Sequence, residues 1–287
     1  MVPDIIANAG PLLERYDVVF CDVWGVIHDG HTAYATAGEA LARFRAGGGT
    51  VILVSNAPFP GDRVATVIDG KGVRRDAWDA IVSSGDIALR HVAEKGYARI
   101  HCIGPEPRDR ALFERLRGRR TELADADAIV CSGLVHDRTQ TAGDYRDVLE
   151  AALKRKLPFV CANPDLAVDV GPDRLPCAGA IAALYEEMGG PVFWAGKPHA
   201  SAYRGAMLKA QELRGAPILP SRVLAIGDAI RTDLAAAQGA GVDALFVAAG
   251  LHRHDSMDGE KIVPEKLAQL FGPGGLPAVA AMPYLAW

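Results

Sequence analysis

Short apolar runs alternate with longer amphipathic segments along almost the whole chain. The short runs are rich in β-branched residues and predict strands, whereas the longer segments repeat their apolar residues at helical spacing and predict helices. The predicted strands are 18–22, 50–55, 98–103, 128–131, 159–162, 223–226 and 244–247, and the predicted helices are 36–45, 86–94, 144–154, 178–188, 199–213 and 232–239. Such alternation is typical of parallel sheets with helices on both faces, so the pattern predicts an α/β fold with a doubly wound sheet.

Three of the predicted strands end in small polar or acidic residues. One strand ends at Asp22, another reaches Ser55 and Asn56, and a third is followed by Asp228. Ligands of open α/β sheets bind at the carboxyl ends of the strands. Each residue alone could also be an ordinary helix cap. Capping is a weaker explanation for three strand ends together, which favour a binding site at one sheet edge.

The residue types at these strand ends suit phosphate chemistry. Carboxylates converging from Asp22 and Asp228 would repel each other unless a cation lay between them, and oxygen ligands favour Mg²⁺. Asp233 follows closely enough to support the metal site, Ser55 offers a hydroxyl for phosphate, and Lys197 adds a positive charge. A carboxylate in such a site can attack phosphorus to form an aspartyl-phosphate.

The spacing of these residues predicts an inserted domain. Ser55 and Lys197 are 142 positions apart, and a loop of that length is improbable without structure of its own. We therefore expect residues 84–190 to form a cap over the strand ends that excludes water and selects the leaving group. Within the cap, Asn163, Pro164 and Asp165 predict either a substrate contact or a plain turn, since Asn-Pro-Asp favours turns.

Composition narrows the range of partners. The 287 residues carry 31 Lys+Arg against 35 Asp+Glu, a net charge of −4, which gives no electrostatic reason to expect nucleic acid or a membrane as partner. The five cysteines lack a C-x-x-C pair and indicate buried, reduced thiols. The first residues do not show the basic region followed by an apolar region that is typical of a signal peptide. No apolar run is long enough to span a membrane, so we expect a cytoplasmic protein.

Four ordered segments of the chain resemble the motifs of the haloacid dehalogenase (HAD) superfamily. They are DVVFCDVWGVIHDG, VILVSNAP, WAGKPHA and VLAIGDAIRTDLAAAQGAG, of which the run from Gly227 to Asp233 is the most specific. More narrowly, they are similar to the class IIA branch of N-acetylglucosamine-phosphatases and p-nitrophenyl-phosphatases. The segment CANPDLAVDVGPDRLPCAGAIAALYEEMGG resembles the cap of that branch. The resemblance implies a Rossmann-like core of residues 1–83 and 191–287 and an α/β cap of residues 84–190.

The same resemblance implies a Mg²⁺-dependent phosphatase and a role for each site residue. Asp22 would be the nucleophile and a metal ligand, and Ser55, Asn56 and Lys197 would hold the phosphate, with Lys197 counted among the catalytic residues. Asp228 and the backbone carbonyl of Trp24 would be further metal ligands, and Asp233 would support them. The substrate would be a small phosphorylated metabolite, contacted from the cap by Asn163 and Asp165.

The chain departs from the family pattern at Trp24. Most phosphatases of this superfamily have a second Asp at this position, which acts as general acid and base. That assistance is typically worth about 10²–10⁴ in rate. Three alternatives stay open: His28 or Asp29 supplies the proton, the substrate supplies it, or the protein binds phosphate esters and acts as a sensor without turning them over. Tyr284 and Trp287 are compatible either with a homodimer contact or with closure of the core.

Overall fold

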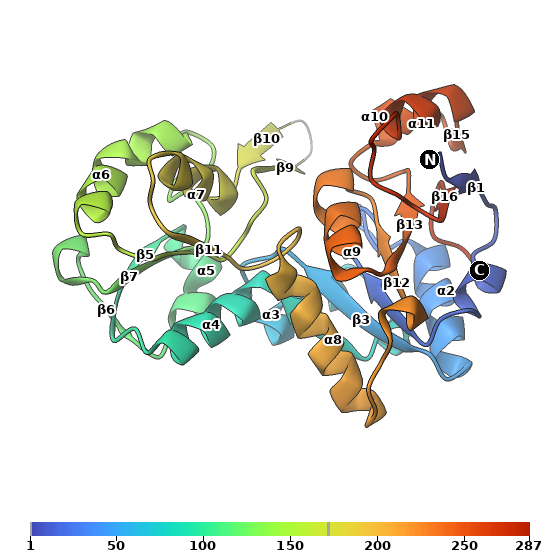
Figure 1. Cartoon of the computed structure of the whole chain (residues 1–287), viewed down its shortest axis with the longest axis horizontal. Coiled ribbons are helices and arrows are strands. Elements are labelled where there is room, and N and C mark those ends of the chain that lie inside the picture. Colours follow the sequence, from blue (N-terminus) through green and yellow to red (C-terminus); the bar gives the residue numbers. More distant parts are fainter. Residues whose placement is uncertain (1, 171–172) are drawn as a thin grey trace. The chain divides into compact units, whose positions relative to one another are not determined.

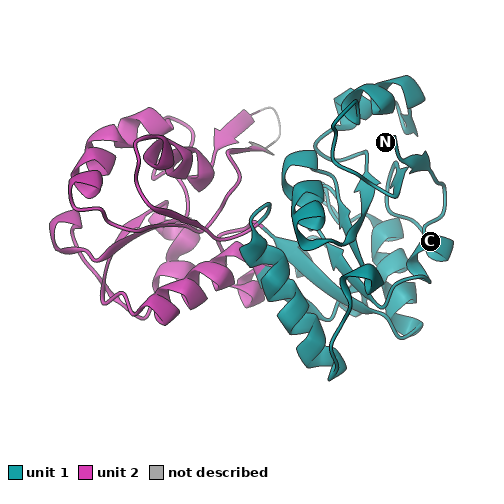
Figure 2. Cartoon of the chain, in the orientation of Figure 1, with its two compact units in different colours: residues 1–55, 65–82, 197–287 teal, residues 56–64, 83–196 magenta. Residues whose placement is uncertain are grey.

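The computed structural model describes residues 2–170 and 173–287, which divide into two compact units (Figures 1 and 2). Unit 1 contains the described residues up to 55, together with 65–82 and 197–287, and unit 2 contains residues 56–64 and 83–196. Both chain ends belong to unit 1, where the first strand, β1 (Asp4–Ile5), pairs in parallel with the last, β16 (Ala280–Met282). None of the helices in the described residues is long and apolar enough to cross a bilayer.

Unit 1 is built on a seven-stranded sheet in the order β1-β16-β13-β12-β2-β3-β4. Its remaining strands are β2 (Val18–Cys21), β3 (Thr50–Ser55), β4 (Ala80–Ser83), β12 (Val223–Gly227) and β13 (Asp243–Val247). The central strands β2 and β12 are buried along their whole length, as expected for parallel strands covered on both faces. The register sets Cys21 opposite Leu53 of β3 and Ile226 of β12, so these three strands end at one edge.

Helices and short turns complete unit 1. The helices are α1 (Gly10–Leu13), α2 (Ala35–Ala46), α8 (Ala200–Arg214), α9 (Ala235–Ala240), α10 (Arg253–Ser256) and α11 (Pro264–Leu270), and a hairpin joins β14 (Met257–Asp258) to β15 (Lys261–Ile262). Short 3₁₀ turns are η1 (Arg75–Ala77) and η4 (Pro220–Arg222), and α3 (Gly61–Asp69) crosses the boundary between the units. Helix α2 buries Ala37, Ala40, Leu41 and Phe44, the spacing of one helical face.

Unit 2 has its own parallel sheet in the order β11-β8-β7-β5-β6. Its strands are β5 (Arg99–Ile103), β6 (Arg119–Arg120), β7 (Ala128–Cys131), β8 (Phe159–Cys161) and β11 (Val192–Trp194), with an antiparallel pair β9 (Ala167–Val170) and β10 (Asp173–Pro176). The helices are α4 (Ser84–Lys95), α5 (Glu106–Phe113), α6 (Arg146–Lys154) and α7 (Ala178–Glu187), with 3₁₀ turns η2 (Leu123–Asp125) and η3 (Ala142–Tyr145).

Side chains of this second sheet alternate between two apolar clusters. Ile129, Cys131 and Phe159 pack with residues of α6 and α7, whereas Val130 and Val160 pack with residues of α4 and α5. Successive residues of a strand point to opposite faces, so the near-continuous apolar runs of β7 and β8 fit a sheet covered on both sides. The predicted α/β class is confirmed.

The structure differs from the predicted elements at several places. The sequence pattern did not predict strands β1, β4, β6, β9, β10, β11, β14, β15 and β16, nor helices α1, α3, α5, α10 and α11. The predicted helix 144–154 begins at Arg146 after a 3₁₀ turn, and the predicted helix 232–239 begins as a π-helical turn, η5 (Ile230–Leu234). Strand β11 pairs with β8, which explains why residues 191–196 belong to unit 2. Residues 171 and 172 of the cap-like segment lie outside the described residues.

Free thiols account for the five cysteines. Cys21, Cys131, Cys161 and Cys177 are buried and Cys102 is half-buried. Burial raises the pKa of each of these thiols above its usual value. Such thiols are poor nucleophiles and metal ligands at neutral pH, which agrees with the prediction of reduced, structural cysteines.

Candidate active site

Three carboxylates meet at the carboxyl edge of the unit 1 sheet. Asp22 follows β2, Asp228 follows β12, and Asp233 lies in the π-helical turn η5. Each offers an oxygen within 4.8 Å of the others. Strands β2 and β12 are parallel neighbours, so the chain brings Asp22 and Asp228 together although they are far apart in sequence. The predicted convergence of these residues is therefore present.

Lys197 lies between two of the three carboxylates. Its Nζ is 2.5 Å from Oδ1 of Asp22 and 2.7 Å from Oδ1 of Asp233. The side chain is only 3% exposed, so the ammonium is almost completely removed from water. Burial disfavours its charged form, but the carboxylates of Asp22 and Asp233 outweigh burial and raise the pKa of Lys197 well above its usual range.

Asp228 is enclosed by backbone from two loops. A Cβ added to Gly25 would lie 2.1 Å from Oδ2 of Asp228, and one added to Gly250 would lie 1.9 Å from the same oxygen. The N–H of Leu251 donates a hydrogen bond of 2.6 Å to that oxygen. Gly25 also has a φ of +80°, which favours glycine. Sequence reasoning missed Gly250 and Leu251, because no local pattern shows that the loop after β13 returns to Asp228.

Among the residues that the structure describes, the formal charges of this cluster do not balance. Burial, followed by the carboxylates of Asp22 and Asp233, raises the pKa of Asp228 well above its usual range. Burial and the Asp22 carboxylate also raise the pKa of Asp233 to about 6, against the lowering effect of Lys197. Three carboxylates and one ammonium leave a formal charge of −2, which one divalent cation would neutralise. Oxygen donors around this charge fit Mg²⁺.

Ser55 and Trp24 lie at the same sheet edge. Ser55 is the half-buried last residue of β3, two positions beyond Leu53, which pairs with Cys21. Trp24 follows Asp22 by two positions, and its side chain is 43% exposed. The carbonyl implied as a metal ligand belongs to the backbone, so the exposed ring leaves that implication unchanged. The roles of both residues stay predictions.

The ring of Trp24 rests on its own loop. It packs edge-to-face against His28, with 5.3 Å between the ring centroids. Its far edge approaches Gly30 so closely that a Cβ there would lie 2.6 Å from Cζ2 of Trp24. Gly30 has a φ of +93°, so glycine provides both the turn and the space for the ring.

His28 and Asp29, the two residues that the sequence suggests as replacement proton donors, form hydrogen bonds with backbone N–H groups of this loop. His28 is buried, and its Nδ1 accepts a 2.8 Å hydrogen bond from the N–H of Gly30. Burial and the charge of Lys71 lower the pKa of His28 to about 4. The Asp29 carboxylate accepts hydrogen bonds from two backbone N–H groups of its turn, which hold its pKa below its usual value. At neutral pH neither group carries a proton suited to a leaving group.

The remaining predicted residues lie in unit 2 and contact one another. Asn56 donates from Nδ2 to Oδ1 of Asp165 at 2.8 Å and accepts from the Ser84 hydroxyl at 3.5 Å. Oδ1 of Asn163 accepts from the N–H of Asp165, as expected for a turn. A Cβ on Gly196 would lie 2.2 Å from Oγ of Ser84 and 2.6 Å from Oδ1 of Asn56. Ser84 and Gly196, which the sequence did not single out, thus help to place Asn56.

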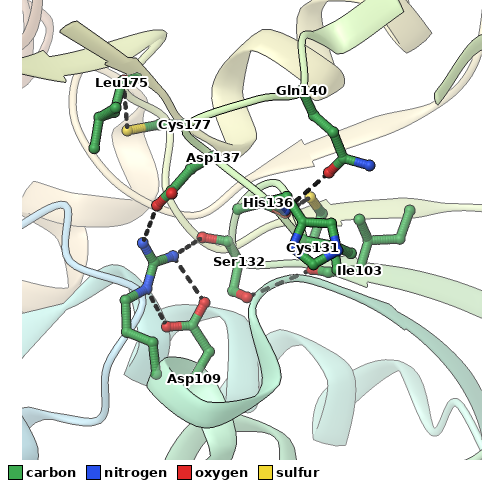
Figure 3. A network of polar contacts seen from close by, with 12 residues as sticks. Ile103, Asp109, Cys131, Ser132, His136, Asp137, Gln140, Leu175 and Cys177 are labelled. Carbon is green, nitrogen blue, oxygen red and sulfur yellow. Dashed lines mark hydrogen bonds and ion pairs between the residues drawn. The ribbon is translucent and has the colours of Figure 1, made fainter. Parts of the chain in front are cut away.

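A second ion pair, of which only the carboxylate is buried, lies at the carboxyl ends of β5 and β7 (Figure 3). Arg108 of α5 forms a two-pronged pair with Asp109, with Nε–Oδ1 and Nη2–Oδ2 distances of 2.7 and 2.9 Å. Nη1 of Arg108 is 3.4 Å from Oδ2 of Asp137, and Nη2 of Arg108 also donates to the carbonyl of Ser132 at 3.5 Å. Asp109 is fully buried. No sequence pattern pointed to this cluster.

Two family models match the chain. Residues 19–116 match the model described as haloacid dehalogenase-like hydrolase, and residues 194–271 match one described as HAD-hydrolase-like. These segments contain Asp22 and Ser55, and Lys197, Asp228 and Asp233, respectively. The match therefore includes every residue of the carboxylate–lysine cluster.

Known proteins similar to the chain include both a solved structure and a curated relative. A hydrolase of the haloacid dehalogenase-like family from Brucella suis 1330 is 38% identical with a TM-score of 0.84, and the match covers 98% of this chain and all of that one. The ribonucleotide monophosphatase NagD of Escherichia coli (strain K12) is 25% identical over 84% of this chain and 90% of its own length.

A third similar protein was solved with a metal. The glycerol phosphate phosphatase of Mycobacterium tuberculosis in complex with magnesium is 22% identical, with a TM-score of 0.65 over 83% of this chain and 70% of that one. At this identity the likeness concerns the fold.

Proposed function

Because the chain belongs to the haloacid dehalogenase-like hydrolase family, we propose that it is a Mg²⁺-dependent phosphatase that forms a phospho-Asp22 intermediate. The proposed substrate is a small phosphorylated metabolite. Phosphatases among the similar proteins support the reaction class, since their names specify ribonucleotide and glycerol phosphate substrates. A cytoplasmic location and a homodimer stay predictions.

The observation that carries this proposal is the uncompensated charge of the carboxylate cluster. A structural cluster would be expected to pair its buried charges, because isolated buried charges are costly. Here Asp22, Asp228 and Asp233 exceed the charge of Lys197 by two. The donors that would hold Mg²⁺ are the carboxylates of Asp22 and Asp228 and the backbone carbonyl of Trp24. The bound ion would neutralise charge on the phosphate and on the two carboxylates.

Asp22 is the proposed nucleophile because its carboxylate is accessible to a substrate and is held in position by Lys197. Its side chain is 13% exposed, whereas Lys197 and Asp233 are almost fully buried. Lys197 holds Oδ1 of Asp22, and within the described residues no hydrogen bond engages Oδ2. That oxygen attacks phosphorus, and the bond between phosphorus and the ester oxygen breaks. The leaving group departs with the electron pair, and water then hydrolyses the acyl phosphate, which restores Asp22 and releases phosphate.

The other residues have supporting roles in the proposal. The Lys197 ammonium and the Ser55 hydroxyl contact phosphate oxygens, and Asp233 keeps Lys197 in place through its 2.7 Å contact. Asn56 stays a predicted phosphate ligand. Unit 2 is the proposed cap, and Asn163 and Asp165 are its proposed substrate residues, although their side chains also build the local turn.

Turnover of p-nitrophenyl phosphate tests the proposal. We expect release of p-nitrophenolate by the wild-type protein with Mg²⁺, a strong reduction with EDTA, and none above background for Asp22→Asn. Asp69→Asn, which changes an exposed carboxylate at the end of α3, is the matched control and should keep full activity. Mass spectrometry of the acid-quenched wild-type protein should show one added phosphoryl group. Undiminished turnover by Asp22→Asn would exclude the covalent mechanism.

A further inference from the structure

Trp24 presents an aromatic surface next to the proposed nucleophile. It is 43% exposed, so part of the side chain faces solvent. The contacts with His28 and Gly30 support one side of the ring, so it is braced rather than free in solvent. Two residues span at most about 7 Å. The ring is therefore within reach of an ester group on a phosphate bound at Asp22.

The same position lacks the group that would protonate a leaving oxygen. An alkoxide is a poor leaving group unless a proton reaches it in the transition state, whereas a phenolate departs without one. His28 is buried and uses Nδ1 to bind the N–H of Gly30, and the Asp29 carboxylate binds backbone N–H groups of its turn. Both side chains therefore stabilise the loop through these hydrogen bonds. The geometry thus favours esters whose leaving group needs no acid.

We propose that Trp24 makes this site selective for aryl phosphates, monoesters in which phosphate is bonded directly to the oxygen of an aromatic ring. The inference rests on the proposed phosphatase function and narrows its substrate class. Asp22 attacks phosphorus, the P–O bond to the ring oxygen breaks, and the phenolate leaves with the electron pair and takes a proton from water. The indole of Trp24 contacts the face or edge of the departing ring.

Three phosphate esters distinguish the two parts of the proposal, which are selectivity for the leaving group and the contact of Trp24 with an aromatic ring. Phenyl phosphate has a ring and a phenolate leaving group, 2-phenylethyl phosphate has a ring but an alkoxide leaving group, and 2-cyclohexylethyl phosphate has an alkoxide and no aromatic ring. For the wild-type protein with Mg²⁺, we expect kcat for phenyl phosphate to exceed that for both alkyl esters by about 10² or more. The alkyl esters should differ from each other mainly in KM, about 3- to 10-fold in favour of the aromatic ring.

Three substitutions of Trp24 then assign each effect. Trp24→Phe keeps a ring without adding an acid and should preserve both preferences. Trp24→Leu removes the ring and should abolish the KM difference while leaving the alkyl esters slow. Trp24→Asp adds an acid and should raise kcat for the alkyl esters by up to about 10⁴, more than for phenyl phosphate. A thermal melt of each variant checks folding, and the exposure of the ring predicts little loss.

Binding distinguishes failure of this inference from failure of the proposed function. If no ester is hydrolysed, the phosphatase proposal fails, and the Kd of phenylphosphonate and methylphosphonate with Mg²⁺ still tests Trp24. Tighter binding of phenylphosphonate by the wild type and Trp24→Phe, lost in Trp24→Leu, would support the aromatic contact. Equal binding of the two phosphonates would overturn it. Wild-type hydrolysis of the alkyl esters at a rate within about tenfold of phenyl phosphate would overturn the leaving-group selectivity.

Discussion

Each unit has a cation paired with a buried carboxylate at the carboxyl ends of its strands, but the two clusters differ in how their charges are matched. In unit 2, the Arg108 guanidinium meets both oxygens of Asp109, and Asp137, the more distant partner, is 30% exposed to solvent. The buried part of that cluster is neutral. In unit 1, Lys197 meets one oxygen each of Asp22 and Asp233, and Asp228 has no cation of its own among the described contacts.

The difference follows from the two side chains. Arginine has a planar fork that matches one carboxylate, so it closes the pair with Asp109. Lysine is a compact point charge that can hold two carboxylates in position without neutralising a third. The comparison indicates that the unit 2 cluster stabilises the fold, whereas the unit 1 cluster is arranged to take an additional positive charge and a phosphate.

The largest expected effect is on activity when Lys197 is replaced. Lys197→Met leaves the carboxylates of Asp22 and Asp233 without their ammonium, so kcat/KM for p-nitrophenyl phosphate should fall by about 10²–10³. Steady-state kinetics with Mg²⁺ measure this effect. Lys209→Met is the matched control, because Lys209 lies on α8 in an exposed pair with Glu212. Its activity should stay within about twofold of wild type, since exposed pairs contribute little.

Two further results would show that the Lys197 effect is specific. Lys197→Arg keeps the charge and should retain more activity than Lys197→Met, and both variants should keep a cooperative thermal melt. Equal activity of Lys197→Met and the wild type would place Lys197 outside the reaction.

The second effect is stabilisation of the protein by Mg²⁺. A ligand at 100 times its Kd stabilises the folded state by about 2.7 kcal/mol, so the wild-type Tm should rise when saturating Mg²⁺ replaces EDTA. Asp228→Asn should remove most of this rise because it reduces the excess negative charge around Asp228. Asp109→Asn should leave the rise unchanged, because the unit 2 cluster is already neutral. An equal Mg²⁺ effect in Asp228→Asn and the wild type would contradict a cation site at this cluster.

The sequence predicted most residues of the carboxylate–lysine cluster in unit 1 and none of the Arg108–Asp109 cluster in unit 2. Asp22 and Asp228 were visible because each follows an apolar strand, and Lys197 because it lies in a recognisable motif. Gly250 and Leu251 were not, since their contact with Asp228 depends on where the loop after β13 returns. Arg108 and Asp109 are neighbours on a charged helix, and their spacing gives no sign that Asp109 is fully buried.

The parts of the fold that a local sequence pattern specifies were predictable, whereas the elements that depend on tertiary contacts were missed. The buried strands β3, residues 50–55, and β7, residues 128–131, were predicted with the bounds that the structure has, because runs rich in β-branched residues favour strands. Strand β11 has only three residues and depends on pairing with β8. Its assignment to a sheet is therefore set by tertiary contacts, which the local pattern does not contain.

The third prediction concerns the stability of unit 2. Asp109→Asn keeps the size of the side chain but replaces one acceptor oxygen with a donor that faces the Arg108 guanidinium, so the free energy of unfolding should fall by about 1.5–3 kcal/mol. Urea unfolding measures the change. Asp137→Asn, a control in the same network, should change stability by less than about 0.5 kcal/mol, because Asp137 is partly exposed and 3.4 Å from Arg108. Similar losses in both variants would mean that the network does not depend on the buried pair.

The smallest expected effect comes from replacing Arg108 with lysine. Arg108→Lys keeps the positive charge but cannot contact both oxygens of Asp109 at once, and it also loses the contact with the Ser132 carbonyl. Arg108 is 41% exposed, so a lysine there can remain partly hydrated, and the loss should be about 1 kcal/mol in urea unfolding. Arg108→Met should cost more than Arg108→Lys, since it leaves the buried Asp109 carboxylate without a partner. If Arg108→Lys were instead as destabilising as Arg108→Met, the geometry of the fork rather than its charge would hold Asp109, and the contrast with the point charge of Lys197 would be sharper still.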